Sequence, residues 1–114
     1  MEMKVHLHPE VFDIVLQGIK DVEIRVNDEK RRKLKVGDTL LFLKRPEEVE
    51  TISAKVTDLV YFSNFQEVVD MYPMERIYLS TTTKEEYVSL MKQFYSDEEV
   101  AKDGIVAIHF ARKK

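Results

Sequence analysis

The sequence predicts an α+β fold in which five or six mostly antiparallel strands form a small curled β-barrel, with helices covering its ends. Segments in which apolar and polar residues alternate recur along the chain, and this pattern is typical of strands with one buried face. Short polar turns join several of these segments, as expected for antiparallel neighbours. Helical spacing of apolar residues appears at about Pro9 to Gln17 and Thr83 to Tyr95, and these two stretches predict helices.

Five segments predict strands. They cover residues 3–8, 22–26 and 39–43, a long segment from 52 to 62, and a final segment from 104 to 111. Alternation is lost between Leu59 and Phe62, where we expect a bend or bulge. The final segment is apolar almost throughout, which predicts burial on both faces. The apolar faces of these segments predict the core residues Val22, Ile24, Val26, Leu40, Phe42, Ile52, Ala54, Val56, Val106 and Ile108.

Capping residues mark the predicted helices. Pro9 suits the first turn of one helix, and Gly18 suits its end because glycine readily adopts the left-handed conformation. Thr83 and Glu86 form a T-x-x-E capping box at the start of another. Ser63 or Asn64 suits the start of a further helix that Pro73 ends, residues 74–79 read as an irregular connection, and residues 96–103 read as a short helical turn.

Length and composition predict one domain spanning residues 1–114. The chain has no cysteine, which excludes disulfides and thiolate metal sites. Its net charge of −3 argues against sequence-independent binding to long duplexes, which depends on bulk positive charge. No apolar run approaches the length of a membrane span, so we expect a cytoplasmic protein with no membrane partner.

The stretch from Leu16 to Phe42 carries the most informative pattern. Gly18, Lys20, Glu23 and Arg25 form G-x-K-x-x-E-x-R, which places Glu23 and Arg25 on one face of a strand and Lys20 at its entrance. We expect this face to be exposed to solvent. Lys20, Glu23 and Arg25, together with Tyr78, are the predicted ligand-binding residues. The alternative is an ion-pair network with a structural role only.

A basic run follows this strand. It consists of Lys30, Arg31, Arg32, Lys33 and Lys35, and it forms a local patch on an otherwise acidic chain. Such a run is either a solvated turn or a contact for nucleic acid, and composition favours neither interpretation.

His6 and His8 lie two residues apart on the polar face of the first predicted strand, a spacing that can hold a metal ion. No third ligand is evident near them in the sequence. We therefore interpret them as surface histidines and expect neither a metal nor a cofactor.

The motif resembles a known family. G-x-K-x-x-E-x-R is followed by K-x-G-D-x-[ILV]-x-F, formed by Lys35, Gly37, Asp38, Leu40 and Phe42, and the two together resemble the ASCH domain family. Residues 104–110 are similar to the closing strand of that family. ASCH domains resemble the PUA domains of RNA-modifying enzymes, so the resemblance implies a PUA-like barrel and RNA binding.

Two functions follow as hypotheses. The first is a module that binds single-stranded RNA or a nucleoside or nucleotide, with aromatic residues such as Tyr72 or Tyr78 stacking on bases. The second is a small amidohydrolase acting on a modified nucleoside such as acetylcytidine, because some ASCH proteins resemble enzymes that use a lysine, a threonine and a glutamate. The catalytic candidates are then Lys20, Glu23, which stands at the threonine position, and Glu75.

The charge of Lys20 separates the two hypotheses. A lysine acts as a base only when its pKa is brought down. We expect Glu23 to stabilise the Lys20 ammonium instead, which favours binding over catalysis.

Overall fold

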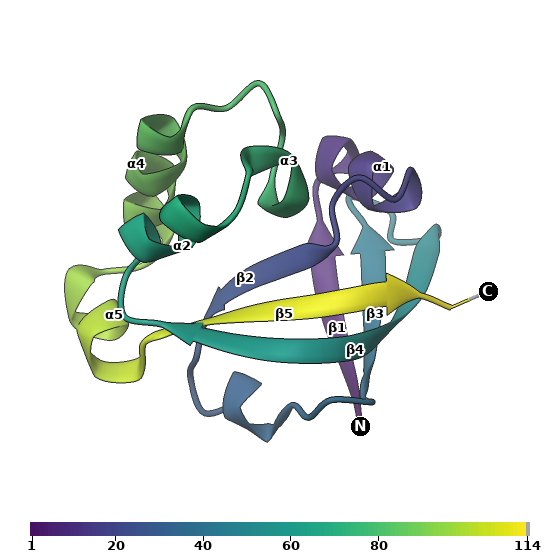
Figure 1. The fold of residues 1–114 in the computed structure, drawn as a ribbon. Coiled ribbons are helices and arrows are strands. Elements are labelled where there is room, and N and C mark those ends of the chain that lie inside the picture. The colour runs from purple at the N-terminus through teal and green to yellow at the C-terminus, as the bar shows by residue number, and fades with distance from the viewer. Residues whose placement is uncertain (114) are drawn as a thin grey trace.

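One curled five-stranded sheet lies at the centre of the computed structural model, which describes residues 1–113 (Figure 1). Its strands lie side by side in the order β1 (Glu2–Leu7), β3 (Thr39–Lys44), β4 (Thr51–Phe62), β5 (Ile105–Arg112) and β2 (Val22–Val26). β1 and β3 are parallel, and the other three pairs are antiparallel. The predicted α+β fold, a curled PUA-like barrel, is confirmed. Across the described residues β1 and β2 are the two edges of the sheet, and we call the opening between them the seam.

Five α-helices occur in the described residues, and the first, second and fourth begin at capping residues that the sequence predicted. They are α1 (Pro9–Leu16), α2 (Phe65–Met71), α3 (Met74–Ile77), α4 (Lys84–Phe94) and α5 (Asp97–Asp103), with a short 3₁₀ helix, η1 (Arg31–Lys33). The Asn64 side chain caps α2, and the capping box of Thr83 and Glu86 starts α4. The predicted irregular connection at residues 74–79 is wrong, because α3 occupies most of it; a single helical turn is too short to produce a periodic pattern. None of the helices described is long and apolar enough to span a bilayer.

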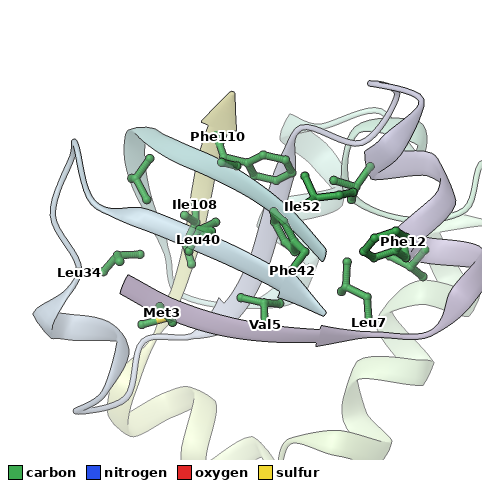
Figure 2. Close-up of a cluster of buried hydrophobic side chains, with 14 of the residues drawn as sticks. Met3, Val5, Leu7, Phe12, Leu34, Leu40, Phe42, Ile52, Ile108 and Phe110 are labelled. Carbon is green, nitrogen blue, oxygen red and sulfur yellow. The ribbon is translucent and has the colours of Figure 1, made fainter. Parts of the chain in front are cut away.

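Two apolar clusters lie on the two faces of the sheet. The first fills the inside of the curl and includes Phe12 of α1 (Figure 2), and the second packs under α2, α3 and α4. β5 contributes to both, with Val106 and Ile108 in the first cluster and Ile105 and Ala107 in the second. This confirms the predicted burial of that strand on both faces. All ten predicted core residues are buried.

The register of β2 places its charged residues on the inner face of the curl. Glu23 lies opposite Ile108 and Arg25 lies opposite Val106, and residues opposite each other across a strand pair share a face. The expectation that this face is exposed to solvent is wrong, because Glu23 is only 6% exposed. The reason is the curl, which encloses the inner face even at the edge of the sheet.

β4 is the strand that turns the sheet. Its first half pairs with β3, and most of its length pairs with β5. The register shifts between Val56 and Asp58, slightly before the predicted bend at residues 59–62. A bulge here increases the local twist and so contributes to the curl.

Ile24, on the face of β2 that packs in the second cluster, gives a direct test of the fold. Ile24→Ala should lower the free energy of unfolding by about 2 to 5 kcal/mol, because Ile24 is buried in the second cluster and the substitution leaves a cavity. Val49→Ala, at a residue that is 82% exposed, should change it by less than about 0.5 kcal/mol. If urea unfolding showed an equally small loss of unfolding free energy for both variants, the assigned faces of β2 would be contradicted.

Candidate functional site

A cleft of about 660 Å³ opens at the seam. One side of it comes from the end of β1, the start of α1 and Arg45, which directly follows β3. The other side comes from α3 and α4, and β2 lies between them. The histidines and charged residues of its lining are His6, His8, Lys20, Glu23, Arg25 and Arg45. The cleft therefore occupies the place where a further strand would be needed to close the barrel.

Lys20 is the most deeply buried of these side chains, at 2% exposure. Gly18, with φ of 79°, reverses the chain after α1 and directs Lys20 inward. Its Nζ lies 2.6 Å from the Val22 carbonyl oxygen, 2.7 Å from that of Ile77 and 3.2 Å from Glu23 Oε1. An ammonium has three N–H donors, so these three acceptors satisfy it completely.

Glu23 lies between two cations. Its Oε1 accepts from Lys20 and from the Ile24 backbone N–H, and its Oε2 accepts from Arg25 Nη2 at 3.1 Å. Burial alone would raise the pKa of Glu23, but the charges of Lys20 and Arg25 outweigh this effect and hold it at about 2. Glu23 is thus an ionised acceptor at the floor of the cleft.

For Lys20, burial has a larger effect on the pKa than the charge of Glu23 has. It lowers the pKa of Lys20 below the ordinary value, and Glu23 opposes this shift. The predicted stabilising effect of Glu23 is therefore present but smaller than the effect of desolvation. The three acceptors around Nζ nevertheless fit an ammonium, because a neutral amine has only two N–H groups.

Arg25 also lines the cleft, and its side chain is 24% exposed. The charge of Glu23 raises its pKa above the ordinary value. Its Nε is buried and has no hydrogen-bond partner among the described residues. A buried donor without a partner carries a free-energy cost.

Aromatic and apolar side chains form the wall opposite β1. Tyr78, a predicted ligand-binding residue, lines the cleft, and its ring centroid lies 5.8 Å from that of buried Tyr87. Leu90, Met91, Phe94 and Tyr95 continue this wall along α4. Phe94 is 65% exposed, so the wall offers an aromatic surface that no described part of the chain covers.

The structure brings four predicted residues together and leaves others outside. Lys20, Glu23, Arg25 and Tyr78 all line the cleft. Glu75, a catalytic candidate, is exposed on α3 and is absent from the lining. Tyr72 is buried, and its hydroxyl lies 2.6 Å from His109 Nε2, so it offers no stacking surface in the cleft.

The basic run lies away from this lining. It includes η1, between β2 and β3 (Figure 1), and none of Lys30, Arg31, Arg32, Lys33 and Lys35 lines the cleft. Arg31 pairs with Asp28 at 3.4 Å and Arg32 with Asp103 at 3.2 Å. These two ion pairs reduce the positive charge that the run can offer to a ligand.

Several lining residues were not predicted from the sequence. His6 and His8 were visible as a pair on the polar face of β1, but nothing local relates them to Glu23. Arg45 lies beside the histidines only because β1 and β3 pair in parallel. The residues of α4 line the cleft only because of the way that helix packs. Residues 1–113 contain no group of three or more histidines, cysteines or carboxylates arranged to hold a metal ion.

The low pKa of Glu23 predicts a specific pH dependence. Its ionisation stabilises the fold above the unfolded-state pKa of about 4.3, and this stabilisation is lost as the pH falls towards 2. Glu23→Gln should therefore cost about 1 to 3 kcal/mol at pH 6, and the difference from wild type should shrink as the pH approaches 2.5. Urea unfolding of both proteins across this range is the measurement.

Glu29→Gln, at an exposed carboxylate, is the control and should show no such trend. A difference between wild type and Glu23→Gln that stays constant from pH 6 to pH 2.5 would contradict the ion network.

The fold is shared with solved structures. It is similar to the crystal structure of hypothetical protein PH0355, with a TM-score of 0.86 and 31% identity, over 99% of this chain and 100% of that one. It is also similar to the solution structure of protein PF0455 from Pyrococcus furiosus, with a TM-score of 0.80 and 27% identity, over 100% of this chain and 99% of that one.

A third similarity concerns the fold alone. A mutant of ZmASCH from Zymomonas mobilis has a TM-score of 0.60 and 15% identity, over 96% of this chain and 67% of that one. No protein with a curated description matches this sequence. A family model described as the ASCH domain matches residues 5–114. Because that match spans nearly the whole chain, the protein belongs to the ASCH domain family.

Proposed function

We propose that the protein binds single-stranded RNA or a nucleotide, with one base inserted into the cleft against Glu23 and Arg25. The observation that carries this proposal is the ionised, buried Glu23, held by two cations at the floor of a cleft with an aromatic wall. Exposed bases of single strands offer both polar edges and flat faces, and the cleft has groups for each.

The polar floor suits a base edge that carries a donor beside an acceptor. Glu23 Oε2 accepts a single hydrogen bond within the described protein, from Arg25, and has capacity for another from an amino group of a base. Arg25 supplies N–H donors beside it. A carboxylate accepts well from the amino group of cytosine, and an arginine donates well to ring nitrogens and carbonyl oxygens.

Lys20 acts through Glu23 in this proposal. All three donors of its ammonium are already used by protein acceptors. Its role is to fix the Glu23 carboxylate in position and to keep it ionised. Membership of the ASCH family supports an RNA ligand, because ASCH domains resemble the PUA domains of RNA-modifying enzymes.

The amidohydrolase alternative is favoured by one observation, the lowered pKa of buried Lys20. A lysine base also needs a free lone pair directed at its substrate. Here Nζ is surrounded by Val22, Ile77 and Glu23, and Glu75 lies outside the cleft lining. The geometry therefore favours binding.

Arg25→Ala tests the proposed contact. It should weaken binding of a short single-stranded RNA by about tenfold or more, because it removes a charged hydrogen-bond donor from the floor of the cleft. Amide chemical shifts recorded during the titration give both the affinity and the location of the site. Shifts confined to residues remote from Lys20, Glu23 and Arg25 would overturn the proposal.

The basic run supplies the matched comparison, as a proposed second contact for a longer strand. Lys30→Ala with Lys33→Ala should weaken binding less than Arg25→Ala. The double substitution should mainly reduce the salt dependence of RNA binding, because contacts of exposed lysines with phosphates are electrostatic.

Glu23→Gln distinguishes a binding module from an enzyme. For a binding module, the substitution should change the preference among bases while affinity stays measurable, since an amide donates as well as accepts. For an enzyme that uses Glu23 in proton transfer, it should preserve binding and lower turnover of acetylcytidine by about 10² or more. Titration with four nucleosides and an assay for released acetate separate these outcomes.

A further inference from the structure

We propose that the cleft takes a phosphorylated nucleoside, with the phosphate held at its mouth by Arg45 and His8. This inference rests on the proposed function and names the ligand class more closely. The phosphate belongs either to a free mononucleotide or to one residue of an RNA strand, and both present the same anion to the site.

The charge of the lining points to an anionic ligand. The lining contains three cationic side chains, Lys20, Arg25 and Arg45, and one carboxylate, Glu23. This excess of positive charge occurs in a chain whose net charge is −3. Glu23 already neutralises one cation of the floor, so the remaining positive charge is available for an anion from the ligand.

The fold brings Arg45 and His8 to the same edge of the sheet. β1 and β3 are parallel, with Leu7 opposite Lys44, so the residues that follow each strand emerge side by side. The Arg45 backbone N–H donates to the Leu7 carbonyl oxygen at 2.9 Å, which fixes this arrangement. His8 precedes α1, and its side chain makes no capping hydrogen bond to that helix.

Two neighbouring basic side chains already have acidic partners, whereas Arg45 has none among residues 1–113. Lys44 lies 3.4 Å from Asp13 and 3.7 Å from Glu50, and His6 Nδ1 lies 2.7 Å from Glu48. Within residues 1–113, neither Arg45 nor His8 has an ion-pair partner, and both side chains are exposed in the cleft lining. An arginine fork matches the geometry of phosphate oxygens, and an adjacent imidazole can add a donor.

The positions of these groups divide the cleft into two parts. Glu23 and the Arg25 side chain form the floor, where a base has polar partners, and Arg45 and His8 form the mouth. A nucleotide has the same division, since its ribose separates the base from the phosphate. The cleft volume of about 660 Å³ lies in the range of pockets that hold ligands of this size.

The test compares nucleosides with their 5′-monophosphates in calorimetric titrations. Wild-type protein should bind the monophosphates about tenfold or more tightly than the nucleosides. Arg45→Ala should remove most of this preference and leave nucleoside affinity unchanged, and His8→Ala should have a smaller effect in the same direction. Lys55→Ala removes the same charge from an exposed position outside the cleft and should leave the preference intact.

Other results of these titrations distinguish failure of the phosphate site from failure of the proposed function. Equal affinity for nucleosides and monophosphates, or equal weakening of both by Arg45→Ala, would overturn the phosphate site and leave base binding intact. Failure of nucleosides, monophosphates and short RNA to bind would overturn the proposed function as well. If Arg45→Ala weakens binding of a trinucleotide as strongly as binding of a monophosphate, the site takes the phosphate of an RNA strand; if it weakens only binding of the monophosphate, the site takes a free nucleotide.

Discussion

The buried ammonium of Lys20 is the interaction on which the rest of the site depends. It links three separate elements, because its acceptors are the Val22 carbonyl on β2, the Ile77 carbonyl at the end of α3, and the Glu23 side chain. Removing a charge from water is costly, and only a complete set of partners offsets that cost. The requirement for three acceptors therefore fixes where α3 sits against β2, and it fixes the Glu23 carboxylate as an ionised group.

The incomplete barrel explains why such a group occurs inside the protein. Because the edge strands β1 and β2 do not pair with each other in the described part of the chain, the inner face of β2 borders an opening instead of a closed core. Asp21 pairs with Arg76 at 2.8 Å and so holds α3 beside the start of β2. α3 and α4 then enclose the opening on one side, while the paired ends of β1 and β3 bound it on the other. The fold thus creates a cleft at its own edge, and the charged network forms the floor of that cleft.

The sequence predicted the features that local patterns determine, namely the core positions and the starts of helices. Alternation along β2 and β4, and the apolar faces assigned to β3 and β5, identified the core, and capping residues such as Thr83 located the start of α4. The spacing of Lys20, Glu23 and Arg25 predicted that they lie together. Their burial was not predictable, because it results from the curl of the sheet and not from any pattern within β2. Arg45 and the α4 wall depend on the parallel pairing of β1 with β3 and on helix packing, and both relate residues far apart in the chain.

The most direct test of the ionised Glu23 acceptor is the carbon-13 signal of the Glu23 side-chain carboxyl in selectively labelled protein. In the free protein the signal should titrate with a pKa of about 2, and at neutral pH it should shift when a nucleotide is added. A pKa near the ordinary value of about 4.3, with no change on addition of nucleotide or short RNA, would contradict the claim that Lys20 and Arg25 hold an ionised acceptor for the ligand.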